Sequence, residues 1–175
     1  ETLATSFGFR AKGKGNITGK NLLVYQVMEA ILQQFLSSEK KQVKQGNQIQ
    51  IIALEHEFTK SIEVNTISRN IFFRGTVDRI DRYNDTLRFV DYKTGSVTAP
   101  DLAFTHWEEL RTLPKKGALF QVLLYAYILK SDFKEPNPIA GVIPLKTFNN
   151  EFLAVSQKEN ARKKHLLYLG DEVLD

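Results

Sequence analysis

Residues 70–93 carry the pattern that constrains the fold of this chain most, because they alternate as two adjacent β-strands do. Residues 70–82 are rich in β-branched and aromatic side chains, and Asn84-Asp85, which tolerates turn conformations, separates them from residues 86–93. On a strand, the latter run would present one face of Leu87, Phe89, Asp91 and Lys93 and another of Arg88, Val90 and Tyr92. The pattern predicts an antiparallel hairpin that places Asp78 beside Asp91.

The predicted hairpin ends one of its apolar faces with charged side chains. Asp91 and Lys93 continue the face begun by Leu87 and Phe89, at a depth where a charge is costly unless it is paired or binds a metal. Two carboxylates and an ammonium on one face suit a hard divalent cation and a phosphate. The alternative is a polar strand end with an ion pair, since Asp-x-Lys alone is common. Gly-x-x-Asp78 followed thirteen residues later by Asp-x-Lys is much rarer.

A helix predicted over residues 115–130 adds a third element. Gln121 and Tyr125 are four residues apart and therefore share one face of that helix. The apolar stripe points elsewhere and consists of Leu119, Val122, Leu123, Ala126 and Leu129.

Together these motifs resemble the RecB/AddB-type branch of the PD-(D/E)XK nuclease superfamily. Gly75-x-x-Asp78, Asp91-x-Lys93-Thr-Gly95 and Gln121-x-x-x-Tyr125 occur in the order and at the spacings of that family. The resemblance implies an α/β fold, with a restriction-endonuclease-like αβββαβ core and a mixed central sheet flanked by helices. It also implies a metal-dependent deoxyribonuclease that uses Mg²⁺, with Mn²⁺ as a substitute.

The resemblance implies a role for each matching residue. Asp78 and Asp91 would be metal ligands, Tyr92 would offer its backbone carbonyl to the metal, and Lys93 would be the catalytic lysine. The residues that would contact DNA are Gln121 and Tyr125, with Lys115 and Lys116 beside the start of their helix, where phosphates are favoured. Glu55 is a second-tier metal ligand, and Arg79 and Asp81 are interpreted as supporting residues.

The chain departs from the family pattern ahead of the first core strand. Members usually carry a His or Glu on the preceding helix, and the helix predicted over residues 19–37 offers only Glu29, which is interpreted as a surface residue. Since the chain begins at Glu1 without a methionine, we interpret it as part of a longer protein that carries this residue upstream, which puts activity of the fragment alone in doubt. In the family, such domains are fused to or paired with helicase-like regions and process DNA ends in double-strand break repair.

Composition bounds these interpretations. At 175 residues with 42% hydrophobic content, the chain fits one globular domain, and no apolar run is long enough to span a bilayer, so we expect a cytoplasmic protein. The absence of cysteine excludes a cysteine-ligated iron–sulfur cluster. The net charge of +4 is mild, and the basic cluster at residues 162–164 is an alternative DNA surface to Lys115-Lys116.

The predicted organisation is an arm over residues 1–18 followed by a nuclease domain over residues 19–175. After the first helix, residues 37–47 are interpreted as a charged loop or frayed helix end, and residues 96–114 as a long connection around Trp107 that gates the DNA path. A capping-box pattern at residues 156–159 predicts a last helix toward Tyr168. The remaining predicted strands are 48–58, a return beginning at 61–64, 139–145 and 152–155.

Two other functional classes remain open at this point. One is a catalytically silent nuclease-like scaffold that binds DNA within a helicase–nuclease complex, and the other is an interaction domain without a nucleic-acid role. Retention of both aspartates together with Lys93, Gln121 and Tyr125 argues against a silent copy.

Overall fold

A five-stranded mixed sheet is the centre of the structure, a computed structural model that describes residues 18–64, 69–112, 116–133, 135, 137–146, 151–158, 164–167 and 169. The first three strands pair antiparallel, the third pairs parallel with the fourth, and the fourth pairs antiparallel with the last. In spatial order they are β1 (Ile49–Val64), β2 (Arg69–Tyr83), β3 (Thr86–Lys93), β5 (Ile139–Pro144) and β6 (Leu153–Ala154). This arrangement confirms the predicted mixed α/β fold.

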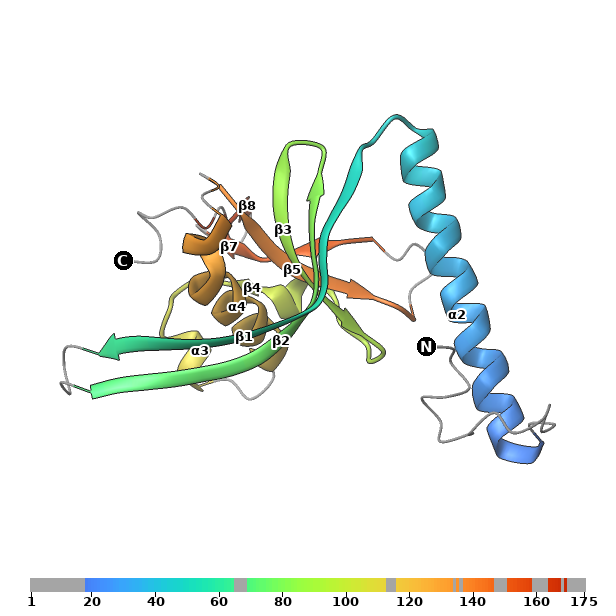
Figure 1. Cartoon of the computed structure of the whole chain (residues 1–175), viewed down its shortest axis with the longest axis horizontal. Coiled ribbons are helices and arrows are strands. Elements are labelled where there is room, and N and C mark those ends of the chain that lie inside the picture. Colours follow the sequence, from blue (N-terminus) through green and yellow to red (C-terminus); the bar gives the residue numbers. More distant parts are fainter. Residues whose placement is uncertain are drawn as a thin grey trace.

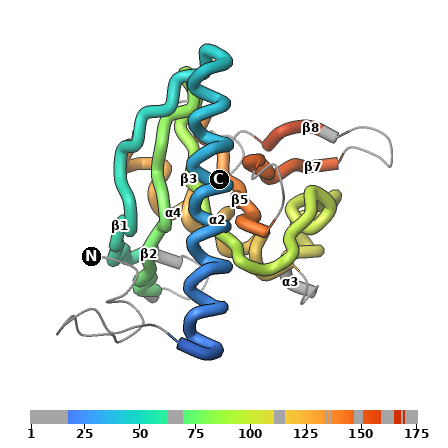
Figure 2. The backbone as a smooth tube through the Cα atoms, turned by 90° about the vertical axis from the view of Figure 1, so that its right-hand side faces the viewer, coloured from blue at the N-terminus to red at the C-terminus, as the bar shows by residue number. Residues whose placement is uncertain are grey.

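Two long helices flank the sheet. Helix α2 (Gly19–Lys44) stands on one side, and α4 (Gly117–Phe133) packs on the other against β3 and β5 (Figures 1 and 2). The predicted stripe of α4 is buried as expected, together with Ile128. By contrast, α2 contains no buried residue, and Leu23, Val27 and Leu36 on it are each at least half exposed. The core therefore lies between the sheet and α4.

The predicted hairpin is correct in both strands and in its turn. Tyr83 pairs with Thr86, and Asn84 adopts a φ of 52° while its side chain accepts a hydrogen bond of 2.9 Å from the backbone N–H of Gln48. Asparagine tolerates this left-handed conformation, which explains its place in the turn. Both faces of β3 are buried, however, so that Arg88 and Val90 are as inaccessible as the face with Leu87 and Phe89.

Strand β2 pairs with β3 only through residues 79–83, whereas it pairs with β1 along almost its whole length. The far halves of β1 and β2 therefore form a two-stranded ribbon that reaches beyond the sheet, as Figure 1 shows at lower left. The prediction that a strand at residues 48–58 ends before a return at 61–64 is wrong. Residues 49–64 form one strand, because β2 supplies a hydrogen-bonding partner along that length.

Three further boundaries differ from the sequence predictions. Helix α2 runs to Lys44, because residues 37–44 consist largely of good helix formers, and Gly46, with a φ of 93°, follows its end. The predicted last helix is wrong, since β7 (Ser156–Lys158) and β8 (Lys164–Leu166) form a second sheet with β4 (Ala103–Phe104). The connection after β3 is not irregular throughout, because it contains β4, a 3-10 helix η2 (Ala99–Leu102) and helix α3 (Glu109–Thr112). The predicted arm lies outside the described residues except for Thr18.

Candidate functional site

Asp78 and Asp91 occupy facing positions where β2 and β3 separate. Pairing of Ile80 with Phe89 puts Asp78 and Asp91 at facing positions two residues further along each strand. Beyond the last ladder pair, the backbone N–H of Tyr92 donates to Asp78 Oδ2 at 2.7 Å in place of a strand hydrogen bond. Asp91 is only 2% exposed, whereas Asp78 is half-buried. The structure therefore brings the two predicted acidic residues together.

Lys93 links these carboxylates to helix α4. Its Nζ lies 2.9 Å from Asp91 Oδ2 and donates to Gln121 Oε1 at 2.7 Å. Gln121 Nε2 donates in turn to the hydroxyl oxygen of Tyr125 at 2.6 Å, so the amide of Gln121 is engaged at both ends. Gln121 and Tyr125 thus face Lys93, and the shared helix face predicted from their spacing is the one turned toward this end of β3.

Asp91 carries the least satisfied charge at this site. Burial raises the pKa of Asp91 above its ordinary value, the Lys93 ammonium lowers it in part, and the carboxylate of Asp78 raises it further. Asp91 Oδ2 is buried and has no hydrogen-bond donor of good geometry among the described residues, although Lys93 lies near it. A buried carboxylate oxygen without a donor beside a second carboxylate suits a divalent cation.

The described residues contain no group of three or more His, Cys, Asp or Glu side chains placed to hold a metal. Among the described residues, Asp78 and Asp91 would be the side-chain ligands of a cation at this site, with water and backbone oxygen as further ligands, as Mg²⁺ commonly has. Glu55 lies across from Asp78 in register, between the pairs of Leu54 with Arg79 and His56 with Val77. Its side chain is exposed and its φ is 49°, and its predicted role as a ligand stays a prediction.

Tyr125 is also held from the β1–β2 ribbon. Its ring meets the ring of Phe58 edge to face, with centroids 6.0 Å apart, and Phe58 is opposite Gly75. A Cβ at Gly75 would approach Phe58 Cζ to 2.9 Å, which is closer than side chains pack. Gly75 therefore leaves room for Phe58, and Phe58 supports Tyr125. A cavity of about 530 Å³ on the ribbon is lined by Glu57–Thr59 and by Arg74–Thr76.

Lys116 has internal partners rather than an open position at the helix start. Its Nζ donates to the carbonyl oxygen of Pro100 at 3.0 Å and to that of Ala103. The ammonium thereby fastens the segment after β3 to the beginning of α4. Lys115 lies outside the described residues, as does the cluster at residues 162–163, while Lys164 is in β8. The DNA contact predicted for Lys115 stays a prediction, as does that of Lys116, although the internal partners of Lys116 argue against it.

A second charged cluster lies on the opposite face of the same strands, and sequence interpretation found only part of it. Arg79 Nε donates to Asp81 Oδ2 at 2.6 Å, and Arg88 Nε and Nη2 donate to Asp81 Oδ1 and Oδ2 at 2.7 Å each. Arg79 Nη1 also donates to Glu39 on α2 at 2.6 Å. The signal in the sequence was the Arg-x-Asp spacing on β2 with Arg88 opposite Asp81 across the hairpin. Nothing local pointed to Glu39.

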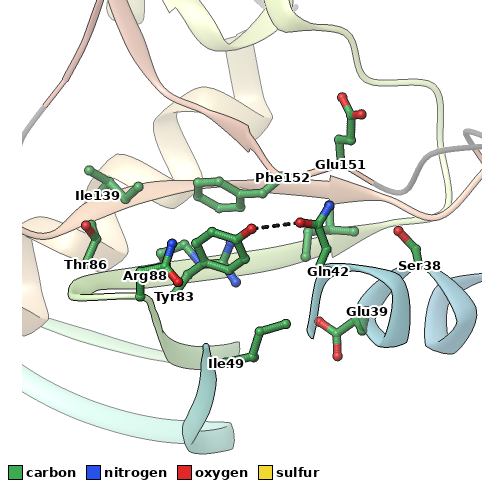
Figure 3. Close-up of a pocket in the computed structure, with 12 residues that line it drawn as sticks. Ser38, Glu39, Gln42, Ile49, Tyr83, Thr86, Arg88, Ile139, Glu151 and Phe152 are labelled. Carbon is green, nitrogen blue, oxygen red and sulfur yellow. Dashed lines mark hydrogen bonds between the residues drawn. The ribbon is translucent and has the colours of Figure 1, made fainter. Parts of the chain in front are cut away.

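Helix α2 is separated from part of the sheet by a cavity of about 410 Å³ (Figure 3). Tyr83 bridges it by donating its hydroxyl to Gln42 Oε1 at 2.8 Å. The guanidinium of Arg88 lies between the rings of Tyr83 and Phe152, 4.4 and 4.8 Å from their centroids. The cavity is lined by residues of the α2 side, so it is distinct from the site of Asp78, Asp91 and Lys93.

Comparison with known proteins assigns a family to this architecture. The family model described as the PD-(D/E)XK nuclease superfamily matches residues 11–168, which is most of the chain. Among curated proteins, none matches the chain significantly. In the part of the chain that the structure describes, no helix is both long and apolar enough to cross a membrane.

Proposed function

The chain belongs to the PD-(D/E)XK nuclease superfamily, and from this membership we propose that it hydrolyses phosphodiester bonds in DNA at Asp78, Asp91 and Lys93. The observation that carries the proposal is the position of Lys93. Its ammonium sits between a buried carboxylate 2.9 Å away and the amide oxygen of Gln121 2.7 Å away. An ammonium group fixed in this way is preorganised to stabilise the negative charge that develops on a phosphate in the transition state. Such electrostatic stabilisation is usually the largest single contribution to the rate of an enzymatic reaction.

Each residue of the site has a defined task in this proposal. Asp78 and Asp91 bind the divalent cation, which we take to be Mg²⁺ with Mn²⁺ as a substitute, together with the backbone carbonyl of Tyr92. When bound, such a cation offsets charge on the scissile phosphate and lowers the pKa of water. Lys93 stabilises negative charge on the phosphate oxygens while water bonds to phosphorus and the P–O bond to the leaving oxygen breaks. The attacking water gives up a proton to solvent, and the leaving oxygen takes one up. Gln121 orients Lys93, and Tyr125 orients Gln121.

The buried position of Asp91 supports a cation requirement. Without a cation, its carboxylate is desolvated and repelled by Asp78, and Lys93 compensates only in part, so the pKa of Asp91 is raised. A divalent cation supplies the missing positive charge. Binding therefore competes with protonation of Asp91, and we expect cation affinity to fall as the pH is lowered, beginning at a higher pH than for an ordinary aspartate.

We further propose that residues 19–175 form the nuclease domain of a RecB/AddB-like helicase–nuclease that works in the cytoplasm. Its helicase-like regions would belong to the same longer chain or to a partner subunit, and the complex would process DNA ends in double-strand break repair. The combination of Gly75-x-x-Asp78, Asp91-x-Lys93 and Gln121-x-x-x-Tyr125 supports this branch of the superfamily.

A cleavage assay with Lys93→Ala tests the proposed chemistry. The full-length protein that contains this chain, taken as the parent, and its Lys93→Ala variant would be incubated with single-stranded and double-stranded DNA in Mg²⁺ or Mn²⁺, with chelator as the blank. We expect the variant to cleave about 10²–10³-fold more slowly while it binds DNA and melts like the parent. Lys60→Ala is the matched control. It removes a lysine whose Nζ lies 2.6 Å from Asp132 Oδ1, and neither residue belongs to the proposed site.

Three outcomes of this assay would contradict the proposal. Equal cleavage by Lys93→Ala and the parent would remove Lys93 from the mechanism. DNA binding by the parent without cleavage in either metal would favour the silent scaffold. A parent chain that binds neither DNA nor metal would favour an interaction domain without a nucleic-acid role.

A further inference from the structure

Tyr92 connects the two faces of the sheet. Its backbone N–H donates to Asp78 Oδ2 at 2.7 Å on the side of the proposed metal site. Its phenol lies toward α2, where Arg79 Nη1 donates to the hydroxyl oxygen at 3.1 Å. The ring also meets Phe35 of α2 edge to face, with centroids 5.4 Å apart. A change in how α2 holds this side chain would therefore reach the backbone amide that orients Asp78.

Arg79 is the link between Tyr92 and α2. It is 1% exposed, and the same Nη1 that contacts Tyr92 donates to Glu39 Oε1 at 2.6 Å. Its Nε is held by Asp81 at 2.6 Å. The guanidinium is therefore fixed by one carboxylate of the sheet and one of the helix, and Nη1 reaches Tyr92 from that fixed position.

Glu39 also completes the charge of the cluster. Arg79 and Arg88 bring two positive charges to it, whereas Asp81 supplies one negative charge from the sheet, and Glu39 supplies the second from α2. An unpaired buried charge is costly, so the ion pair between Arg79 and Glu39 is strongly favoured over their separation. Because α2 has no fully buried residue, such polar contacts contribute to fastening the helix to the sheet, together with partly buried side chains such as Phe35.

We propose that Glu39 and Arg79 are positioning residues for the cation site, acting through Tyr92 on the carboxylate of Asp78. The inference rests on the proposed function, because it assumes that Asp78 is a cation ligand. Groups that hydrogen-bond to metal ligands fix the ligand's orientation, and their removal commonly weakens metal binding by about 10–100-fold. In this chain the orienting group is a backbone N–H, and a side chain on the far face sets its position.

Two tyrosines give a matched test. Tyr92→Phe and Tyr83→Phe each delete one phenolic hydroxyl that forms a hydrogen bond on the α2 side, to Arg79 and to Gln42 respectively. Of these two tyrosines, Tyr92 is the one whose backbone N–H donates to Asp78. Calorimetric titration with Mn²⁺, at a fixed pH, would give the dissociation constant of the full-length parent protein and of each of its folded variants. We expect Tyr92→Phe to bind Mn²⁺ about 10-fold more weakly than the parent and Tyr83→Phe to bind like the parent, with similar small changes in melting temperature for both.

Glu39→Gln provides a second measurement on the helix side. It retains the shape of Glu39 and removes the charge that balances Arg79, so we expect Mn²⁺ affinity to fall at least as far as in Tyr92→Phe. Unchanged affinity in Tyr92→Phe, or an equal loss in Tyr83→Phe, would overturn the inference and leave the proposed function intact. A full-length parent protein that binds no Mn²⁺ would instead overturn the proposed function, and the inference with it.

Discussion

The two faces of the central sheet each bury an aspartate, but they leave it in different states. On the α2 face, Asp81 is fully buried and accepts hydrogen bonds from Arg79 and Arg88 on both of its oxygens. On the α4 face, Asp91 is almost as buried, yet among the described residues its Oδ2 lacks a well-oriented donor, and the ammonium of Lys93 lies 2.9 Å from it. A buried acid with its acceptors filled is structural, whereas one left short of donors is available to a ligand.

The helices on the two faces differ in the same sense. Helix α4 buries six apolar residues and thereby holds Gln121 and Tyr125 rigidly toward Lys93. Helix α2 buries none, and it contacts the sheet through Glu39, Gln42 and Phe35. On the α4 face, apolar packing of the helix fixes the positions of the polar side chains. On the α2 face, ion pairs contribute more to fixing them.

The largest expected effect is on the structural aspartate. Asp81→Asn would leave Arg79 paired with Glu39 and would remove the carboxylate that pairs with the buried Arg88. Removing one partner of a buried ion pair typically costs about 3–5 kcal/mol of unfolding free energy, which urea denaturation followed by circular dichroism would measure. Asp132→Asn is the control, because its partner Lys60 is exposed enough to rehydrate. Equal stability of the two variants would contradict the assignment of Asp81 as structural.

The corresponding substitution on the α4 face, Asp91→Asn, should raise the unfolding free energy rather than lower it. Asp91→Asn removes a desolvated charge, and we expect a gain in unfolding free energy of about 0.5–2 kcal/mol, the range of common stabilising single substitutions. We expect the metal-free variant to unfold at higher urea concentration than the parent at pH 7–8 and to lose Mn²⁺ binding. Lower stability of Asp91→Asn at neutral pH would mean that Lys93 satisfies Asp91 fully.

The pH dependence of this gain follows from the raised pKa of Asp91. A folded-state pKa above the unfolded value favours the native state fully below the unfolded pKa, and that contribution is lost as the pH rises through the folded pKa. The parent therefore carries the penalty of ionised Asp91 only at higher pH. The stability difference between Asp91→Asn and the parent should shrink on acidification and vanish below about pH 4, near the ordinary value for an aspartate.

The difference between the faces also explains how far the sequence could be interpreted. Alternation over residues 86–93 and the Asn84 turn predicted the hairpin, and with it the meeting of Asp78 and Asp91, because strand register is a local property once the turn is known. The spacing of Gln121 and Tyr125 likewise predicted their common face, because residues four apart lie on one side of a helix, which is also a local property. The contact of Glu39 with Arg79 joins residues 40 apart, and no local periodicity encodes it.

The C-terminal error has a similar origin. The pattern at Ser156–Glu159 favours a helix start, but Ser156 pairs in parallel with Ala103 and in antiparallel with Leu166. These partners lie on other segments of the chain, and tertiary pairing outweighs a local preference of this size. The length of α2 was underestimated for a different reason, since residues 37–47 were interpreted as a charged loop or frayed helix end although residues 37–44 consist largely of good helix formers.

An intermediate effect is expected at Tyr125, where the α4 face depends on one hydrogen bond. Tyr125→Phe deletes the hydroxyl that accepts from Gln121 Nε2 at 2.6 Å and keeps the ring against Phe58. Gln121 could then turn away from Lys93, so we expect DNA cleavage to slow by about 10-fold, with a stability loss of about 0.5–1.5 kcal/mol. Tyr127→Phe, on the same helix, is the control. A loss of stability without a change in cleavage rate would make Tyr125 structural only.

The smallest effect is expected for Lys116→Ala. This variant asks whether a lysine ammonium, like the carboxylate of Asp81, is structural when its hydrogen bonds are made within the protein. Lys116 donates to the carbonyl oxygens of Pro100 and Ala103, so its charge is engaged within the protein as that of Arg79 is. We expect Lys116→Ala to lower the unfolding free energy by about 1 kcal/mol and to leave DNA affinity nearly unchanged. Lys115→Ala should instead retain stability and reduce the slope of log affinity against log salt by about 1, as loss of one phosphate contact does. A weaker salt dependence in Lys116→Ala would show that Lys116 leaves its carbonyl partners when DNA binds, and that internal hydrogen bonds do not by themselves mark a charge as structural.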